Sequence, residues 1–469
     1  MKLPDGPKTL PFIQLLQWID NPLKFMDSCS QRYGDCFTVR FGKFKPMVFF
    51  SNPQAIEQIF TSNTEQFDSG RANLVLRPWV GDKSLLLLDG RSHQRQRKLL
   101  TPPFHGDRMK SYGEMICNIT ERVISAWQID EPFSVREAMQ EISLSVILQT
   151  VFGLQGGDRT EKLKQLLTDL LDMTASPVSS SMVFFKALQQ DLGSWSPWGR
   201  FVRLRAHIDE IIYAEISDRR QHPDSSRVDI LSLLMAAKDE NGELMSDVEL
   251  RDELLTLLTA GHETTASALT WALYWIHYLP EVKCKLMDDL ASVGNLDFSA
   301  ISKLPYLNAV CQETLRIYPI AMLTFFRIAN APINIMGQEF EPETVLTPCI
   351  YLTHHRPDLY PEPNQFKPER FLERQFSPYE YIPFGGGNRR CIGLAFALYE
   401  MKLVLVTVMS RYSLALAGSS TVKPVRRGVT LAPSSGKWLV ATQRRSVILL
   451  GNLLTAVEKV RYQVCSDSR

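Results

Sequence analysis

Apolar side chains recur with helical spacing along most of the 469-residue chain. In residues 201–221 and 228–238 they return every three or four positions and so form one face of a helix. Alternation of apolar and polar positions, which is typical of strands, is confined to short regions. The clearest is residues 36–51, which predict a hairpin that turns at Gly42 and Lys43.

Two further strand regions are expected at about residues 333–351 and 429–440. The strand-rich part of the chain therefore covers three regions, at about residues 30–60, 330–352 and 425–445. Helices fill the remainder. No Ser/Gly linker, repeat or low-complexity stretch divides the sequence, so we expect one domain over residues 1–469, mainly α with a minor β portion.

The longest helix is predicted near the middle of the sequence. Ser246 and Glu249 form a capping box, apolar spacing continues from there to Leu279, and Pro280 ends it. At 1.5 Å per residue such a helix spans roughly 45 to 50 Å, long enough to cross the whole domain. We expect it to lie at the centre of the fold.

The middle of this helix, with the sequence AGHETT at residues 260–265, is unfavourable for helix stability. Gly261 costs about 1 kcal/mol relative to Ala in a helix interior, and threonine hydroxyls compete for the i−4 carbonyl groups. Close packing of another helix explains the glycine. It leaves unexplained why an acid, Glu263, stands next to an alcohol, Thr264, which is the pair of groups that a proton relay uses.

A second unusual segment, FGGGNRRCIG, places Cys391 between a glycine-rich loop and an apolar helix that runs to about Arg411. The glycines let the backbone approach a flat ligand. The helix N-terminus, Arg389 and Arg390 favour the thiolate that coordinates iron. A buried structural thiol is the usual role of a lone cysteine and stays open. A phosphate loop lacks its Gly-Lys-Ser/Thr ending, and a zinc site lacks paired ligands nearby.

Two charged pairs share a helix face elsewhere in the sequence. Glu313 and Arg316 are three residues apart among apolar neighbours, which indicates a buried ion pair that needs further hydrogen bonds. His93 and Arg97 are four residues apart and lie one above the other on a helix. A solvated surface is the alternative for both pairs.

The composition excludes several classes of protein. With 45% apolar and 22% charged residues the chain can bury a large core, and a formal charge of +1 gives no bulk attraction to nucleic acid. Eight scattered cysteines argue against a disulfide-stapled secreted protein. Residues 1–20 contain neither the roughly 18-residue apolar run of a membrane span nor a signal-peptide core. We expect a soluble, cytoplasmic protein without a transmembrane segment.

The segment that contains Phe384, Gly387, Arg389, Cys391 and Gly393 resembles the haem-binding loop of the cytochrome P-450 superfamily, the haem-thiolate monooxygenases. The resemblance implies the P-450 fold, with haem b held between the long central helix and the helix after the loop. It also implies that the cysteine is the iron ligand. In this family the phenylalanine packs beside the sulfur, and electron donation by the thiolate favours O–O cleavage.

Three further motifs follow in the order of that family. The AGHETT segment resembles its oxygen-activation motif, which implies catalytic roles for Glu263 and Thr264, room for dioxygen at Gly261, and a substrate contact at Ala260. Binding of the haem propionates is implied for His93, Arg97, Arg327 and Arg389.

A structural role is implied for a second arginine near the buried ion pair. Pro368-Glu-Arg370-Phe371 resembles the segment whose arginine joins Glu313 and Arg316. Together these three residues are expected to lock the loop that leads to Cys391.

The resemblance places the substrate against residues 74–86 and 176–185, the central helix near residue 257, and residues 320–324. These regions are mostly apolar, so an apolar substrate is expected. The residues expected to contact it are Leu76, Arg77, Leu85, Leu257, Ala260, Ala321, Leu323 and Thr324. Because Arg77 can meet a carboxylate, a long-chain fatty acid is the first candidate and a terpenoid the second; an exposed loop residue is the alternative for Arg77.

The implied reaction inserts one atom of O2 into an unactivated C–H bond. No nucleotide-binding fingerprint occurs, so electrons are expected from a separate ferredoxin or flavodoxin with its NAD(P)H reductase. Four cations are expected to steer that partner: Arg95, Lys98, Arg390 and Lys402. A non-catalytic haem-binding sensor or carrier is the alternative, although it has no need of an acid beside an alcohol.

We expect the protein to be a monomer. Trp195 and Trp198, in the region that forms the substrate-entry lid in the family, either touch a membrane or pack under a loop.

Overall fold

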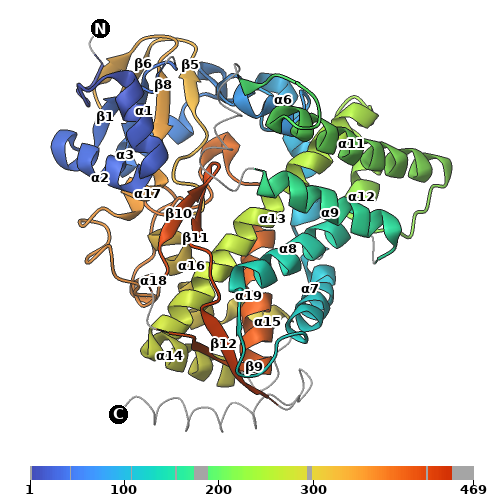
Figure 1. Ribbon diagram of the computed structural model, residues 1–469. Coiled ribbons are helices and arrows are strands. Elements are labelled where there is room, and N and C mark those ends of the chain that lie inside the picture. The colour runs from blue at the N-terminus through green and yellow to red at the C-terminus, as the bar shows by residue number, and fades with distance from the viewer. Residues whose placement is uncertain are drawn as a thin grey trace.

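The computed structural model describes seven stretches of the chain: residues 3–42, 44–106, 108–153, 156–173, 188–292, 298–418 and 421–445. Helices make up most of them. The strands of the largest sheet gather on one side together with the first helices (Figure 1). The expected class, mainly α with a minor β portion, is confirmed. Within these stretches no helix combines the length and the apolar character needed to cross a membrane.

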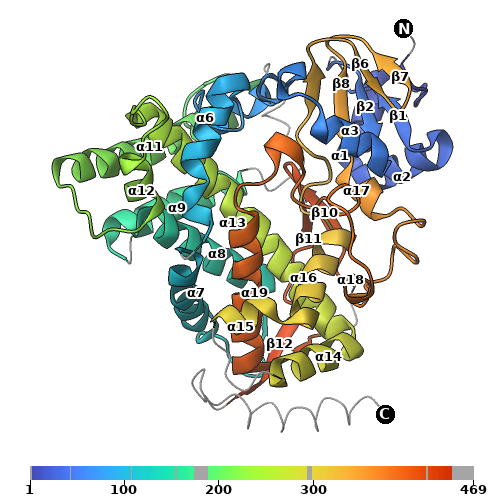
Figure 2. The same ribbon diagram turned by 180° about the vertical axis from the view of Figure 1, so that it is seen from behind.

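Helix α13 (Asp247–Tyr278) runs through the middle of the molecule (Figures 1 and 2). The predicted capping box is present: Glu249 N–H donates to Ser246 Oγ (3.3 Å), and Ser246 N–H donates to Glu249 Oε2 (2.8 Å). The helix ends at Leu279, ahead of Pro280. It packs against four long helices, α8 (Val135–Phe152), α11 (Pro197–Gln221), α16 (Pro305–Ile317) and α19 (Leu394–Arg411).

The remaining helices surround this centre. They are α1 (Pro11–Asp20), α2 (Pro22–Tyr33), α3 (Pro53–Thr61), α4 (Ser69–Ala72), α5 (Arg77–Val80), α6 (Gly90–Leu100), α7 (Arg108–Ile124), α9 (Asp158–Asp172), α12 (Ile230–Ala236), α14 (Pro280–Ala291), α15 (Phe298–Lys303), α17 (Ile350–His354) and α18 (Arg370–Glu373). The two helices predicted at residues 201–221 and 228–238 are α11 and α12, with slightly different ends.

The largest sheet has five strands in the order β1-β2-β8-β5-β3. Its first two strands are antiparallel, with Cys36 opposite Phe50, which confirms the predicted hairpin. Strand β8 is parallel to β2 and antiparallel to β5, so the sheet joins segments that lie far apart in the sequence. The strands are β1 (Cys36–Val39), β2 (Met47–Phe50), β3 (Phe67–Asp68), β5 (Arg327–Ala329) and β8 (Val345–Pro348).

The other two strand regions differ from expectation in detail. The region from residue 333 holds β6 and β7 before β8, and it ends in α17 because Thr353 N–H and Oγ1 both donate to Cys349 O, as in a helix. Residues 429–440 divide between two small sheets, β10-β11 and β4-β12-β9. These strands are β4 (Pro132–Phe133), β6 (Ile333–Ile335), β7 (Gln338–Phe340), β9 (Tyr412–Leu416), β10 (Pro424–Arg427), β11 (Thr430–Pro433) and β12 (Leu439–Arg444).

A fully buried ion pair joins Glu313 and Arg316 of α16. Arg316 Nε is 2.6 Å from Glu313 Oε2 and Nη2 is 2.8 Å from Oε1, so the pair is bidentate. Arg316 also donates to the carbonyl oxygens of His354, Pro363 and Gln365, at 2.8 to 3.2 Å. These bonds supply the extra partners that a buried ion pair requires.

Arg370 joins the same carboxylate from the start of α18. Its Nε is 3.1 Å from Glu313 Oε1, and Lys367 N–H donates to that oxygen at 2.8 Å. Glu313 therefore holds two guanidinium groups and one main-chain amide. Since the partners of this network extend from residue 354 to residue 370, it fastens the segment that precedes the cysteine loop to α16.

Replacing Glu313 by Gln should lower the free energy of unfolding by about 3 to 5 kcal/mol, because Arg316 and Arg370 lose their buried counter-charge. Urea denaturation of the purified protein measures the change. Asp358→Asn is the matched control, since Asp358 pairs with Arg356 but is 60% exposed and should cost less than about 1 kcal/mol. Equal losses in the two variants would show that the buried network is not a main support of the fold.

Candidate functional site

The loop that ends at Cys391 closes on itself, because Cys391 N–H donates to Phe384 O at 2.9 Å. Two of its three consecutive glycines, Gly386 and Gly387, face Phe60 of α3. A Cβ on Gly386 would lie 2.2 Å from the Phe60 ring, and a Cβ on Gly387 would lie 2.7 Å from the Phe60 carbonyl oxygen. Gly386 and Gly387 therefore admit α3, whereas none of the described atoms lies within 4 Å of a Cβ on Gly385. Close approach of this loop to a flat ligand stays a prediction.

Cys391 lies just before α19, which begins at Leu394, slightly later than expected. Although its side chain is exposed, the protein packed around it raises the pKa of the thiol, while the Gly393 N–H, Arg97 and Arg390 lower it. The net direction is the opposite of the expected one, because desolvation outweighs the nearby positive charge. A coordinating metal ion reverses this balance by displacing the thiol proton.

Four basic side chains converge next to this loop from three elements of the fold: His93 and Arg97 from α6, Arg327 from β5, and Arg389 from the loop itself. Burial and the charges of the three arginines lower the pKa of His93 to about 3, which places all three guanidinium groups near its ring. Burial and the charge of Arg389 also lower the pKa of Arg327 to about 9.

The hydrogen bonds of this cluster leave much of its positive charge unbalanced. Arg97 and Arg327 donate to main-chain carbonyl oxygens at 2.7 to 3.4 Å. Arg389 Nη2 forms an ion pair with Asp89 Oδ1 at 2.6 Å. Within the described part of the chain, no other carboxylate pairs with these three arginines, and the buried Arg389 Nε has no hydrogen-bond partner. The cluster therefore has room for further anionic groups.

The middle of α13 differs from the rest of that helix in its exposure. Residues 252–258 and 265–274 are buried, but Ala260 between them is exposed and Thr264 is half-buried. Thr264 Oγ1 donates to Ala260 O, one turn earlier, at 2.6 Å. The alcohol is thus held on the exposed turn, with its oxygen lone pairs free to accept a hydrogen bond.

Gly261 has a packing role. A Cβ there would lie 3.0 Å from Ile147 Cδ1, so the missing side chain lets α8 pack closely on α13. This contact accounts for the glycine, and room for dioxygen at Gly261 stays a prediction. The same turn also contacts Ser143 of α8, whose Oγ donates to Gly261 O at 3.4 Å. The Ser143 side chain also hydrogen-bonds Glu400 of α19, and burial raises the pKa of Glu400 to about 8.

Glu263 is held by two side chains of α8 that the sequence did not indicate. Arg136 Nη2 is 2.5 Å from Glu263 Oε1, and Gln140 Nε2 donates to Oε2 at 2.9 Å. The Glu263 side chain is 14% exposed, so the acid keeps access to solvent while it is paired. His262 is buried, with Nε2 3.2 Å from Gln140 O, in keeping with a structural role.

The residues expected around the substrate do not share one apolar core. Leu85 and Leu257 are buried in the large core between the helices. Ala321 and Leu323 instead pack against the two smaller cores that include strands of the main sheet. Leu85 and Leu257 thus share the core that contains α13, and their contact with substrate stays a prediction.

Arg77 lies at the surface. Its Nε is 2.5 Å from Asp82 Oδ1, and its side chain is 62% exposed. The expected role as a free cation that faces the substrate is corrected, because the guanidinium already has an exposed carboxylate partner. Leu76 is half-buried and Thr324 is buried. The expected wall at residues 176–185 lies outside the described residues.

The cations expected to steer a redox partner have different environments. Arg95 forms ion pairs with carboxylates at 2.5 and 2.7 Å, and Lys402 donates to a main-chain carbonyl at 2.8 Å. Lys98 and Arg390 are exposed, although Lys98 has an acidic neighbour. The two tryptophans also differ: Trp198 stacks on Phe201, while Trp195 is 78% exposed.

Comparison with known proteins decides the family. The family model described as Cytochrome P450 matches residues 4–440. The chain belongs to the cytochrome P450 family. Cytochrome P450 135B1 of Mycobacterium tuberculosis is 35% identical over 450 residues, which cover 95% of this chain and 93% of that protein. Cytochrome P450 135A1 of the same organism is 32% identical over 453 residues, with 96% and 97% covered.

Two solved P450 structures have the same fold. A cyanobacterial P450, CYP120A1 with bound retinoic acid, is 25% identical, covers 92% of this chain with 100% of its own, and has a TM-score of 0.77. The haem domain of cytochrome P450DA is 21% identical, covers 96% of this chain with 99% of its own, and has a TM-score of 0.81. The chain is therefore a haem-thiolate monooxygenase with haem b as its cofactor.

The residues present fit this cofactor. Haem carries two propionates, and the cluster of His93, Arg97, Arg327 and Arg389 has three guanidinium groups with Asp89 as their carboxylate partner. Two further carboxylates match the excess of positive charge. Cys391 stands at the same loop, with an exposed side chain.

A Gly386→Ala substitution tests the contact that shapes this loop. Overpacking against Phe60 should cost about 1 to 3 kcal/mol and should lower the fraction of haem retained through purification. In a Phe60→Ala background the same substitution should cost much less, because the ring is gone. A double-mutant cycle of thermal unfolding measures the difference. If the cost is equal in both backgrounds, the glycine is required for another reason.

Proposed function

We propose that Cys391 ligates the haem iron of this P450 and that His93, Arg97, Arg327 and Arg389 bind the two propionates. The supporting observation is the buried cluster of arginines beside the cysteine, which has more positive than negative charge. When bound, the haem supplies O2 activation and the insertion of one oxygen atom into a C–H bond, driven by two electrons from outside.

Thr264 and Glu263 supply the protons in this proposal. The Thr264 hydroxyl is positioned on the exposed turn of α13 by its bond to Ala260 O. Glu263 lies next to it, paired with Arg136 and Gln140 and still partly accessible to solvent. Transfer through Glu263 requires its carboxylate to leave Arg136, take a proton and turn toward the threonine. Arg136 therefore sets the resting position of the acid.

We further propose that the substrate is a long-chain fatty acid or a terpenoid. Leu85 and Leu257 belong to the apolar core between the helices, and an apolar wall of this kind accepts an apolar molecule. The solved relative CYP120A1 is described with retinoic acid, an apolar molecule with one carboxylate. Because Arg77 is paired with Asp82, the substrate carboxylate, where there is one, is not expected to bind at that position.

An acidic ferredoxin or flavodoxin is the proposed electron donor. Lys98 and Arg390 are the two exposed cations of the expected set, and they lie on the side of α6 and of the cysteine loop. Such a patch steers an acidic partner at low salt.

We also propose that the chain works as a monomer in the cytoplasm. The buried Cys29, Cys117, Cys311 and Cys349 form no disulfide, which is consistent with a reducing compartment.

Turnover of a fatty-acid and terpenoid panel under ¹⁸O2 tests the proposed reaction. With a surrogate ferredoxin and reductase, the hydroxylated product should carry one ¹⁸O atom. Thr264→Ala should lower product formed per NAD(P)H consumed by roughly tenfold or more, without weakening substrate binding. Thr264→Ser keeps the hydroxyl and should retain most of the coupling. Label from water in the product, or equal coupling in all three proteins, would refute the proposed roles.

A further inference from the structure

Residues 79–88 comprise the end of α5 and most of its connection to α6, and they pass along α13. We name them the wall segment, because they include Leu85, which the proposed function places against the substrate. Hydrogen bonds hold the segment on two sides. On one side it contacts carboxylates of α13, and on the other it contacts Arg389 of the proposed propionate cluster.

On the α13 edge, three neighbouring side chains hold the wall segment. Lys83 N–H donates to Asp252 Oδ2 at 2.7 Å, and Leu85 N–H donates to Glu253 Oε1 at 2.8 Å. Ser84 Oγ and the hydroxyl of the α13 residue Thr256 are 2.7 Å apart. Asp252 and Glu253 are each 1% exposed. Three consecutive residues of the wall segment are thus fixed to the first turns of α13.

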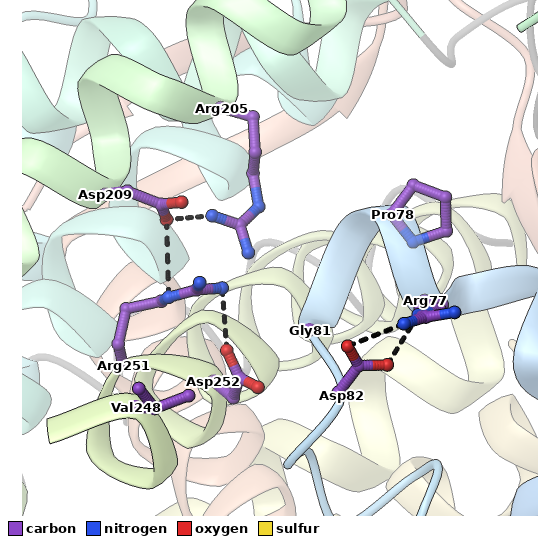
Figure 3. Close-up of a pocket in the computed structure, with 9 residues that line it drawn as sticks. All are labelled: Arg77, Pro78, Gly81, Asp82, Arg205, Asp209, Val248, Arg251 and Asp252. Carbon is purple, nitrogen blue, oxygen red and sulfur yellow. Dashed lines mark hydrogen bonds and ion pairs between the residues drawn. The ribbon is translucent and has the colours of Figure 1, made fainter.

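A surface cavity of about 410 Å³ adjoins this edge. Figure 3 shows a row of ion pairs on one side of it, Arg205–Asp209–Arg251–Asp252, with Gly81 nearby and the pair Arg77–Asp82 farther across. Arginines and aspartates are equal in number in its lining, so the cavity has no net charge with which to hold an ion. Instead the row links α11 and α13 to the wall segment: Arg205 Nε donates to Trp79 O at 3.2 Å.

On the other edge, Arg389 Nη1 donates to Leu85 O at 3.1 Å and Nη2 donates to Leu88 O at 2.5 Å. Leu85 is therefore fixed through both of its main-chain polar groups. Its N–H bonds to α13, and its C=O bonds to an arginine of the proposed haem site. A displacement at either edge must move the Leu85 side chain.

From this geometry we propose that Glu253 is a positioning residue for substrate selection, which holds Leu85 at the pocket wall through the bond to its N–H. This inference rests on the proposed function, since it assumes that Leu85 borders the substrate. Asp252 supports the same wall through Lys83. Neither carboxylate contacts the reacting atoms.

Glu253 acts on the wall segment as a hydrogen-bond acceptor, through Oε1. Burial raises the pKa of its carboxyl well above the ordinary value, with Asp252 and Glu249 adding to the rise. Among the described residues, Glu253 Oε2 has no hydrogen-bond partner. Gln offers the same acceptor oxygen in a neutral group of the same size, whereas Leu offers none.

Binding of imidazole and of 1-dodecylimidazole to the ferric holoprotein tests this proposal. Both coordinate iron through nitrogen, but the dodecyl chain also occupies the substrate pocket. Glu253→Leu should raise the dissociation constant of 1-dodecylimidazole about tenfold and leave that of imidazole unchanged. Glu253→Gln should match the wild type for both ligands. A merely structural role would weaken both ligands together or lower the haem content of both variants.

A pair of glycine variants gives a second test of the position of the wall segment, without any change at Glu253. Gly81 has φ +84°, and a Cβ there would lie 2.1 Å from Asp252 Oδ1. Gly242 has φ +81°, and none of the described atoms lies within 4 Å of its Cβ position. Gly81→Ala and Gly242→Ala both place a Cβ at a positive φ, but only the change at Gly81 also puts that Cβ against Asp252. Weaker 1-dodecylimidazole binding is expected in Gly81→Ala alone.

The proposal is overturned if Glu253→Leu binds 1-dodecylimidazole as tightly as Glu253→Gln does. Where Glu253→Leu does not retain haem, the glycine pair decides: equal affinities for 1-dodecylimidazole in Gly81→Ala and Gly242→Ala overturn it. Failure of the proposed function itself has a different signature, because the wild type would then not show the reduced carbon monoxide spectrum of a thiolate-ligated haem.

Discussion

The structure depends on a concentration of buried positive charge beside the cysteine loop. Arg327 and Arg389 are buried, and burial together with the charges of these two residues and Arg97 lowers the pKa of His93 to about 3. Their carboxylate partner Asp89 also accepts N–H groups from residues 69–71, so its charge is already shared. Burying charge without enough counter-charge is costly. Binding of a cofactor with two carboxylates supplies the missing counter-charge and so removes that cost.

Several parts of the fold converge on this cluster. The main sheet brings β5 and its Arg327 against the loop, α6 brings His93 and Arg97, and the buried network around Glu313 anchors the segment that precedes the loop. The wall segment then extends the same set of contacts to α13. One set of main-chain and guanidinium bonds therefore connects the proposed haem site to the proposed pocket wall.

Local patterns allowed much of this site to be predicted from the sequence. The capping box at Ser246 and the Glu313–Arg316 pair are spaced within a few residues, so helical geometry alone brings them together. The basic cluster required the family resemblance, since β5, α6 and the loop are far apart in the chain. Arg136 and Gln140 were missed because nothing local distinguishes them from other polar residues on α8. Their role depends on how α8 packs against α13, which the sequence pattern does not specify.

The corrections have a common physical cause. Gly261, Gly386 and Gly387 are expected to make room for ligands, and in the structure their missing side chains also make room for Ile147 and Phe60, which distant segments supply. Arg77 and Arg95 were expected to have free charge, but carboxylates meet them in the folded chain. In each case the residue type indicated a close contact or a counter-charge, and the folded protein supplies that contact or counter-charge from its own residues.

The central claim, that Cys391 holds the iron, is tested most directly by the reduced carbon monoxide difference spectrum. The wild type is expected to show the red-shifted Soret band of thiolate-ligated haem, and Cys391→His should shift that band to the position typical of histidine-ligated haem while haem stays bound. A wild-type band at the histidine position, or a thiolate band that persists in Cys391→His, would contradict the assignment.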